Sequence, residues 1–266
     1  MRTLQIGLVQ MDSRPGETDT NLARAKQWLN SLPAGLQIAC LPEFFNTGYH
    51  LDLIGDRFYE LAEPIPGPTT ATLGAIARAR RMAILANIPE SDERQAGVLY
   101  DTTFALDQDG ELVGRYRKTH LYPTENRYFR AGAELPVFDL DIVRIGTAIC
   151  FDHAFPEIFR ALALKGAQLV FIPSAVPVGY EYLLDLRTRA RAQDNQIWVA
   201  AVNRVGVEGE VRYCGRSKVV DPKGRVVAEA SQRNEEVLIA EIDLSAILRE
   251  RQQEPVLRTR RPELYR

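Results

Sequence analysis

The chain has 266 residues, of which 45% are hydrophobic, and a formal net charge of -2 at pH 7. This length and composition allow a sizeable core within one α/β domain, and the small net charge argues against nucleic acid as the main partner. The three cysteines, Cys40, Cys150 and Cys214, form no CxxC pair, so they fit a reducing, cytoplasmic setting better than a disulfide framework or a zinc site.

The first half of the chain alternates between strand and helix patterns. Continuous apolar runs predict strands at 4–10, 36–41 and 82–88, and apolar residues at helical spacing predict helices at 18–32 and 69–80. Two further runs, 98–106 and 111–117, flank the sequence Asp107-Gln108-Asp109-Gly110 and predict a hairpin. This half is therefore expected to combine alternating β and α elements with some antiparallel pairing.

The second half repeats this rhythm. An apolar run from 143 predicts a strand that ends at Cys150, followed by a helix from about 156 to 165, with Gly166 as its C-cap. The sequence further predicts a helix at 180–195 and strands at 168–173, 197–203, 213–220, 225–230 and 237–242. Because no linker interrupts the alternation, we expect a single α/β domain over residues 1–266.

The C-terminal stretch 245–266 is expected to form a helix and an arm. Its last ten residues, LRTRRPELYR, are basic and contain proline, so composition alone favours a solvated arm over a segment that crosses a partner subunit. No apolar run approaches the roughly 20 residues of a membrane-spanning helix, and residues 1–12 do not resemble a signal peptide. We therefore expect a soluble protein without a membrane partner.

Three reactive side chains stand at predicted strand ends: Glu43 in LPEFFNTGY, Lys118 in GRYRKTHLYP and Cys150 in GTAICFDHAFPE. Each alone is weak evidence, because isolated glutamates and lysines are usually solvated and isolated cysteines usually buried. Together they could support cysteine attack on a carbonyl or nitrile carbon, with Glu43 moving protons and Lys118 holding the oxyanion. Backbone N–H groups and a helix N-terminus near Cys150 are expected to favour its thiolate.

Histidine is the chemical alternative to Glu43 as the base. His120 lies two residues from Lys118 and would share its face of an extended strand, and His153 follows Cys150 by three residues. A Cys-His arrangement thus stays open on spacing alone. With His50 included, the histidines are too dispersed for a zinc site, and no glycine loop suits a phosphate, so neither a metal nor an organic cofactor is expected.

The three reactive segments, in this chain order, resemble the signature blocks of the nitrilase superfamily, the carbon-nitrogen hydrolases. The resemblance extends from Leu4 to about Asp243 through LALKGAQLVFIPSA, RARAQDNQIWVAAVNRVG and GRSKVVDPKGRVV. It implies a four-layer α-β-β-α sandwich with a triad of general base and acid, oxyanion stabiliser and nucleophile, carried by Glu43, Lys118 and Cys150.

The same resemblance implies further roles. Glu125 is expected to position the site, the backbone N–H of Phe151 to be a second oxyanion donor, and His120 and His153 to be structural. It also implies a homodimer or higher homo-oligomer that pairs through helices beside the cysteine, with the C-terminal arm draped over the neighbour.

Two departures from the family pattern stand out. Phe151-Asp152 follows the cysteine where true nitrilases tend to have Trp-Glu, and this brings the chain closer to the amidase and carbamoylase branches. Asp194 stands where family members more often have glutamate before asparagine, which shortens the acid by one methylene.

The substrate pocket is expected to be lined by loop residues that are mostly apolar or aromatic: Phe44, Tyr49, Tyr122, Phe151, Ser174, Ala175 and Val176. This lining predicts a small, aliphatic or neutral amide, cleaved to a carboxylic acid and ammonia through a cysteine thioester. One of Arg187, Arg189 and Arg191 at the pocket mouth would instead select a carboxylated substrate, such as an N-carbamoyl amino acid or an ω-amide. Nitrile hydrolysis and acyl transfer from the same thioester are further alternatives.

Overall fold

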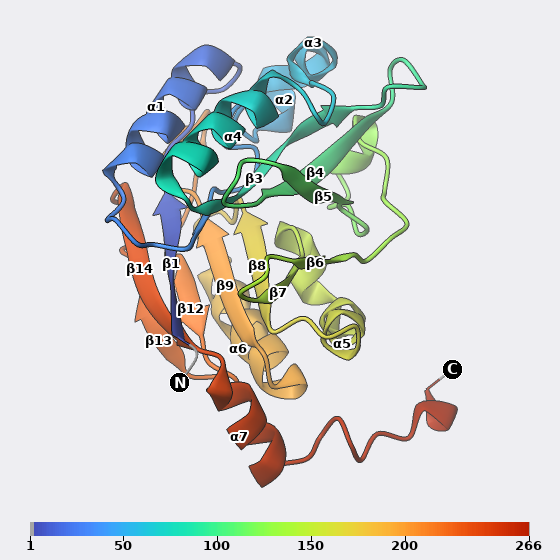
Figure 1. Ribbon diagram of the computed structural model, residues 1–266. Coiled ribbons are helices and arrows are strands. Elements are labelled where there is room, and N and C mark those ends of the chain that lie inside the picture. Colours follow the sequence, from blue (N-terminus) through green and yellow to red (C-terminus); the bar gives the residue numbers. More distant parts are fainter. Residues whose placement is uncertain (1–2, 266) are drawn as a thin grey trace.

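The computed structural model describes residues 3–265, in which two six-stranded sheets pack face to face (Figure 1). In the first sheet three central strands are parallel, and antiparallel strands flank them on both sides. Its order is β14 (Glu236–Asp243), β1 (Thr3–Gln10), β2 (Ile38–Cys40), β3 (Ala83–Ser91), β4 (Leu99–Leu106) and β5 (Leu112–Arg117).

The second sheet has the same plan, with a parallel centre and antiparallel edges. Its order is β13 (Val226–Glu229), β12 (Lys218–Val220), β9 (Trp198–Asn203), β8 (Leu169–Ser174), β7 (Arg144–Thr147) and β6 (Val137–Asp139). The parallel pairings require crossover connections, and these carry the long helices predicted from the apolar spacing.

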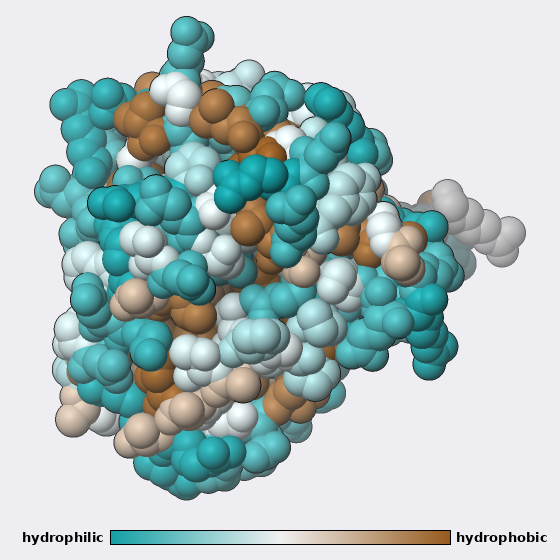
Figure 2. Space-filling view, turned by 90° about the horizontal axis from the view of Figure 1, so that it is seen from above, coloured by the Kyte–Doolittle hydropathy of each residue, from teal (hydrophilic) through white to brown (hydrophobic). Residues whose placement is uncertain are grey.

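Helices cover the outer face of each sheet. An apolar cluster joins α1 (Thr18–Ser31) and α4 (Pro68–Arg80) to the first sheet, and another joins α5 (Pro156–Leu164) and α6 (Glu181–Asn195) to the second. A third cluster, including Ile6, Ile145 and Phe171, fills the space between the sheets. The predicted four-layer α-β-β-α sandwich is thus confirmed. Seen from above, the helical face at the top of Figure 1 is mainly hydrophilic, with apolar side chains showing between the polar ones (Figure 2).

Several short elements were not predicted, because they are too short to show a periodic pattern. They are α2 (Leu51–Ile54), η1 (Gly55–Arg57), α3 (Phe58–Leu61), η2 (Glu125–Arg127), η3 (Cys150–Ala154), β10 (Val207–Glu208) and β11 (Val211–Arg212). The strand predicted at 213–220 was partly wrong. It shrinks to β12, because Gly215 and Arg216 have φ values of 57° and 58°, which an extended strand does not accept.

The C-terminal stretch contains α7 (Ser245–Gln253) and the short helix η4 (Pro262–Leu264). In Figure 1 the segment after α7 leads away from both sheets, and its side chains Leu264 and Tyr265 are exposed. Contact of this arm with a partner subunit stays a prediction. Within residues 3–265, no helix is long and apolar enough to cross a membrane.

Candidate active site

The reactive residues lie just past strand ends of both sheets. Glu43 follows β2, Lys118 directly follows β5, and Cys150 comes shortly after β7. β2 runs parallel to β1, and β7 runs parallel to β8. The arrowheads of β1 and β8 point the same way in Figure 1, so the carboxyl ends of the central strands of both sheets lie at one edge of the sandwich, where α/β proteins place their ligands. Glu125 reaches this edge from η2.

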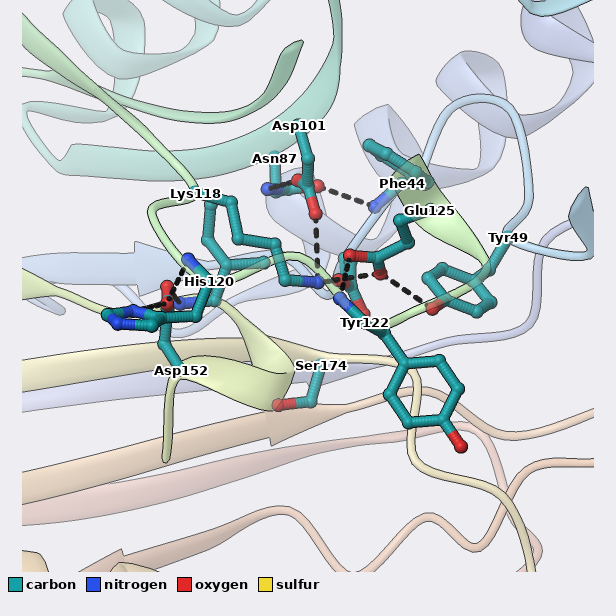
Figure 3. A network of polar contacts seen from close by, with 12 residues as sticks. Phe44, Tyr49, Asn87, Asp101, Lys118, His120, Tyr122, Glu125, Asp152 and Ser174 are labelled. Atoms are coloured by element: carbon teal, nitrogen blue, oxygen red, sulfur yellow. Dashed lines mark hydrogen bonds and ion pairs between the residues drawn. The ribbon is translucent and has the colours of Figure 1, made fainter. Parts of the chain in front are cut away.

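Lys118 is the centre of a buried ionic cluster. Its Nζ lies 2.7 Å from Glu43 Oε1, 2.7 Å from Glu125 Oε1 and 3.1 Å from Asp101 Oδ2 (Figure 3). All four side chains are fully buried. We call Glu43, Asp101, Lys118 and Glu125 the Lys118 cluster.

Asn87 on β3 fixes the back of this cluster. Its Nδ2 donates to Asp101 Oδ1 at 2.7 Å, and its Oδ1 accepts the Phe44 backbone N–H at 2.8 Å (Figure 3). Phe44 has a φ of 47°, a left-handed conformation that is costly for a side chain of this size. The Asn87 bond therefore holds the strained turn that follows Glu43.

Glu125 is held from the cavity side. Its Oε1 accepts a 2.6 Å hydrogen bond from the Tyr49 hydroxyl in addition to the Lys118 ammonium, and its Oε2 accepts the Tyr122 backbone N–H at 2.7 Å. Both oxygens therefore have donors, which fix the orientation of the carboxylate.

Cys150 occupies a strained turn at the start of η3, with a φ of 42°. Asp152 braces this turn: its Oδ2 accepts the Ile149 N–H at 2.9 Å and the Tyr116 hydroxyl at 2.7 Å. Backbone strain of this kind is of the order of 1–3 kcal/mol and persists where the surroundings enforce it. The buried Asp152 is the group that enforces it here.

The electrostatics around Cys150 correct one expectation from the sequence. Burial and the charge of Glu43 raise the pKa of the thiol well above its usual value, although Lys118 and the Ala175 backbone N–H act to lower it. The expected thiolate was wrong for the resting state, because desolvation outweighs the positive charge and the N–H group. A base must therefore remove the thiol proton.

The pKa values of the two central charged groups also move far from their usual range. Burial, reinforced by the charges of Asp101 and Glu125, raises the pKa of Glu43 well above its ordinary value against the opposing effect of Lys118. For Lys118, burial favours the neutral amine, but Glu125, Glu43 and Asp101 outweigh it and raise its pKa. Lys118 therefore stays charged, and Glu43 holds a proton strongly.

His120 and His153 are poorly suited to act as the base. His120 donates its backbone N–H to Asp152 Oδ1 at 3.0 Å, and its ring stacks on Phe155 with centroids 3.8 Å apart. Burial, with the charges of Arg187 and Arg191, lowers the pKa of His153 to about 3. A ring with this pKa is a poor acceptor for a thiol proton at neutral pH, so the geometry favours Glu43 over a Cys-His arrangement.

A cavity of about 680 Å³ opens beside Cys150. Cys150 itself belongs to its lining, together with the predicted residues Tyr49, Tyr122, Phe151, Ala175 and Val176. Two other residues predicted to line the pocket, Phe44 and Ser174, are not among the described residues that line this cavity. Phe44 is buried against Phe58 and Phe129, and the Ser174 hydroxyl donates to the Ile172 carbonyl.

The sequence did not decide which of Arg187, Arg189 and Arg191 reaches the pocket, and the structure gives them different surroundings. Arg187 lines the cavity, and its Nη1 lies 3.3 Å from His153 Nδ1. Arg189 instead donates to the Gly224 carbonyl at 3.0 Å, and Arg191 to the His153 carbonyl at 3.1 Å. Arg187 is therefore the one of the three that can meet a substrate.

Asp101 and Asn87 were missed by the sequence analysis. Asp101 lies on the predicted hairpin, but its contact with Lys118 depends on the strand register. The β4–β5 register pairs Thr102 with Arg117 and brings the Lys118 N–H to the Asp101 carbonyl at 2.8 Å. Register could not be read from the sequence alone.

Carboxylate oxygens of Glu43, Asp101 and Glu125 lie within 4.8 Å of one another, a spacing that a metal ion could use. The Lys118 ammonium contacts all three groups and already supplies positive charge at that position.

Comparisons with known proteins agree on one family. The model described as "Carbon-nitrogen hydrolase" matches residues 5–252. Omega-amidase NIT2 of Homo sapiens is 33% identical over 284 residues, which cover 100% of this chain and 98% of that protein. The structure of Saccharomyces cerevisiae Nit3, a member of branch 10 of the nitrilase superfamily, aligns with a TM-score of 0.88 and 29% identity over 98% of this chain and 97% of that one.

A further similar structure is a mutant of the amidase from Nesterenkonia sp. AN1 with the acetamide moiety of fluoroacetamide added covalently at its active site cysteine. It aligns with a TM-score of 0.86 and 28% identity, over 98% of this chain and 95% of that chain.

Proposed function

This chain belongs to the carbon-nitrogen hydrolase family, and on that premise we propose that it hydrolyses a small linear amide to a carboxylic acid and ammonia through a Cys150 thioester. One observation carries the proposal. Cys150 lines the cavity, and the charges of Glu43, Lys118 and Glu125 all act on its thiol. A nucleophile, a base and a cation thus share one site.

The first step is attack by Cys150 on the amide carbon. Since the pKa of the thiol is raised, Glu43 in its carboxylate form takes the thiol proton as the carbon–sulfur bond forms. The Lys118 ammonium and the Phe151 backbone N–H stabilise the negative charge that develops on the carbonyl oxygen.

The second step breaks the carbon–nitrogen bond. Glu43 returns its proton to the leaving nitrogen, ammonia departs, and the acyl group stays on the sulfur as a thioester. A water molecule then attacks the thioester while Glu43 takes one of its protons, and the released thiolate recovers that proton. Glu125 keeps Lys118 in place throughout, because it accepts a 2.7 Å hydrogen bond from the ammonium and another from the Tyr49 hydroxyl.

One observation favours a narrower second candidate, an amide that also carries a carboxylate. The Arg187 guanidinium lines the cavity, its hydrogen-bonding neighbour His153 is neutral, and no ion pair compensates Arg187 among the described residues. A guanidinium without an acidic partner, in a cavity lined mainly by apolar and aromatic residues, suits bidentate binding of a carboxylate. The relative named as an omega-amidase supports this candidate.

Ammonia release from butyramide and from succinamate, its carboxylated counterpart of equal chain length, tests both candidates. We expect Cys150→Ala to abolish release from either substrate while the thermal unfolding transition is retained. A Cys150→Ala enzyme that still releases ammonia at the wild-type rate would overturn the proposed mechanism.

Arg187→Leu separates the two substrate classes. If Arg187 binds a carboxylate, the Arg187→Leu change raises KM for succinamate by about 10- to 100-fold, as expected for the loss of one charge-assisted hydrogen bond. Butyramide hydrolysis then changes little. Arg189→Leu is the matched control on the same helix, because Arg189 bonds to Gly224 instead. Equal effects of Arg187→Leu on both substrates would rule out the carboxylated candidate and leave the neutral amide.

A further inference from the structure

Asp101 is the member of the Lys118 cluster to which the proposed mechanism gives no role. It lies on β4, is fully buried, and places Oδ2 at 3.1 Å from the Lys118 Nζ. Its Oδ1 accepts the Asn87 side-chain N–H at 2.7 Å. The aspartate is therefore held against the ammonium by a rigid strand and a neutral partner, although Glu43 and Glu125 already bind that ammonium.

The charges of the cluster do not balance when every acid is ionised. Among the described residues, Lys118 is the one cation in contact with Glu43, Asp101 and Glu125. All four groups are fully removed from solvent. An excess of buried negative charge is relieved by proton uptake, because an unpaired ion in a low-dielectric interior is far more costly than a neutral acid.

The hydrogen bonds indicate where the extra proton lies. Both Glu125 oxygens have donors, so this residue has no need of one. By contrast, Glu43 Oε2 is buried without a hydrogen-bond partner among the described residues, and Asp101 Oδ2 has only its 3.1 Å ion-pair contact with the Lys118 Nζ. Carboxylate oxygens of Glu43 and Asp101 lie within 4.8 Å of each other, so one proton held between the two groups would remove one negative charge from the cluster.

We propose that Asp101 is a positioning residue that shares one proton with Glu43 and so controls when Glu43 is free to act as a base. The inference rests on the proposed role of Glu43. When the proton resides on Asp101, Glu43 is a carboxylate and can accept the Cys150 thiol proton; when it resides on Glu43, that transfer is blocked. The exchange moves one proton between two oxygens and changes no other bond.

The surroundings agree with this sharing. Lys118 after β5, Glu125 from η2, and Tyr49 and Cys150 from the cavity side are the titratable groups whose charges act within this site. Burial raises the pKa of Asp101 to about 6, while the charge of Lys118 and hydrogen bonding with the Glu43 side chain act to lower it. Burial raises the pKa of Glu43 further, and the charge of Asp101 adds to that rise.

Asp101→Asn tests the inference, because it removes the charge and the titrating group while keeping the shape and an acceptor for Asn87. The rate of Cys150 alkylation by iodoacetamide, followed by mass spectrometry from acid to neutral pH, reports when Glu43 can accept the thiol proton. We expect the midpoint of this profile, and of the acid limb of kcat/KM, to move to lower pH by about one unit, the coupling typical of two interacting acids. An unmoved midpoint, or a shift to higher pH, would overturn the proposal.

Asp185→Asn is the matched control, since Asp185 is an aspartate beside the other fully buried lysine, Lys218. It is expected to leave the alkylation midpoint where it is in the wild type. An equal shift in both variants would show a general effect of removing one negative charge and would contradict a special role for Asp101.

Infrared spectroscopy of the wild-type protein tests the shared proton even if Asp101→Asn does not fold. At pH 7 we expect a carbonyl-stretch band of a protonated carboxyl group that responds to carbon-13 labelling of aspartate or glutamate. Absence of this band refutes the proton sharing. Neither this measurement nor the alkylation profile needs an amide substrate, so failure of the proposed hydrolysis would be seen separately as a wild-type enzyme that releases no ammonia.

Discussion

The protein contains two fully buried lysines, Lys118 and Lys218, and their surroundings differ in charge. Lys218 on β12 lies 3.0 Å from Asp185 Oδ1 and 3.5 Å from Glu229 Oε1. These two acids are also paired with Arg189 and Arg216, respectively. The group formed by Asp185, Arg189, Arg216, Lys218 and Glu229, here the Lys218 cluster, therefore has more positive than negative charges, whereas the Lys118 cluster has three acids around one ammonium.

Solvent access separates the two clusters further. The side chains of Asp185 and Glu229 are 33% and 29% exposed, while every member of the Lys118 cluster is 0% exposed. Water can therefore solvate the acids around Lys218, and that cluster acts as an ion pair between α6, β12 and β13. A buried lysine alone does not indicate chemistry. A surplus of buried acids beside a reactive thiol does indicate chemistry, because it raises the pKa values of Glu43 and Asp101 and so allows them to exchange protons.

Replacing each lysine with methionine gives the largest expected difference. Lys118→Met should lower kcat/KM by about 100-fold or more, because it removes an oxyanion partner. Lys218→Met should leave kcat/KM within a few-fold of wild type. Lys118→Met should also lose about 3–5 kcal/mol of unfolding free energy, the usual result of breaking a buried ion pair, and Lys218→Met should lose less, because its acids are partly solvated and keep arginine partners. Initial rates with denaturant titrations check both, and a 100-fold activity loss in folded Lys218→Met would break the comparison.

Replacing one acid in each cluster with glutamine should give a smaller difference. Glu125→Gln keeps an acceptor for the Tyr49 hydroxyl but weakens the 2.7 Å bond to Lys118. Loss of such a charge-assisted bond is expected to lower kcat by about 10-fold. Glu229→Gln should not change kcat. Steady-state kinetics measures kcat of the two variants. An unchanged kcat in Glu125→Gln would mean that Glu125 does not position Lys118.

Much of this architecture could be predicted from the sequence, because its elements have strong local signals. The strand expected at 168–173 is β8, at Leu169–Ser174, and the helix expected at 156–165 is α5, at Pro156–Leu164. The resemblance to the carbon-nitrogen hydrolases identified Cys150, which lines the cavity, and Glu43, Lys118 and Glu125, which the structure brings together in one buried cluster. Their individual roles stay predictions.

What could not be predicted depends on contacts between distant segments. Asp101 reaches Lys118 through the register of β4 on β5, which no local pattern encodes. The resting protonation of Cys150 was predicted with the wrong sign, since the helix N-terminus was readable but the burial and the nearby Glu43 were not. In the same way, nothing in the sequence distinguished Arg187 from Arg189 until α6 was placed against the cavity.

The smallest expected effect is a difference in how the two clusters respond to pH. Burial raises the pKa of Asp101 from 3.8 to about 6, so between these values the folded protein holds a proton that the unfolded chain has lost. Its contribution to stability is therefore present below pH 3.8 and is lost as the pH rises through 6, by at most about 1.4 kcal/mol per pH unit.

Asp185 has the opposite sign. Burial acts to raise its pKa, but the hydrogen bond and charge of Lys218 outweigh burial and lower it, so its contribution is lost as the pH falls below 3.8. Between pH 4 and 6, Asp101→Asn should therefore flatten the fall in unfolding free energy, and Asp185→Asn should leave the wild-type slope unchanged. Urea titrations across that range measure the slopes. Equal slopes in wild type and Asp101→Asn would mean that Asp101 takes up no proton on folding, which would remove this distinction between Asp101 and Asp185.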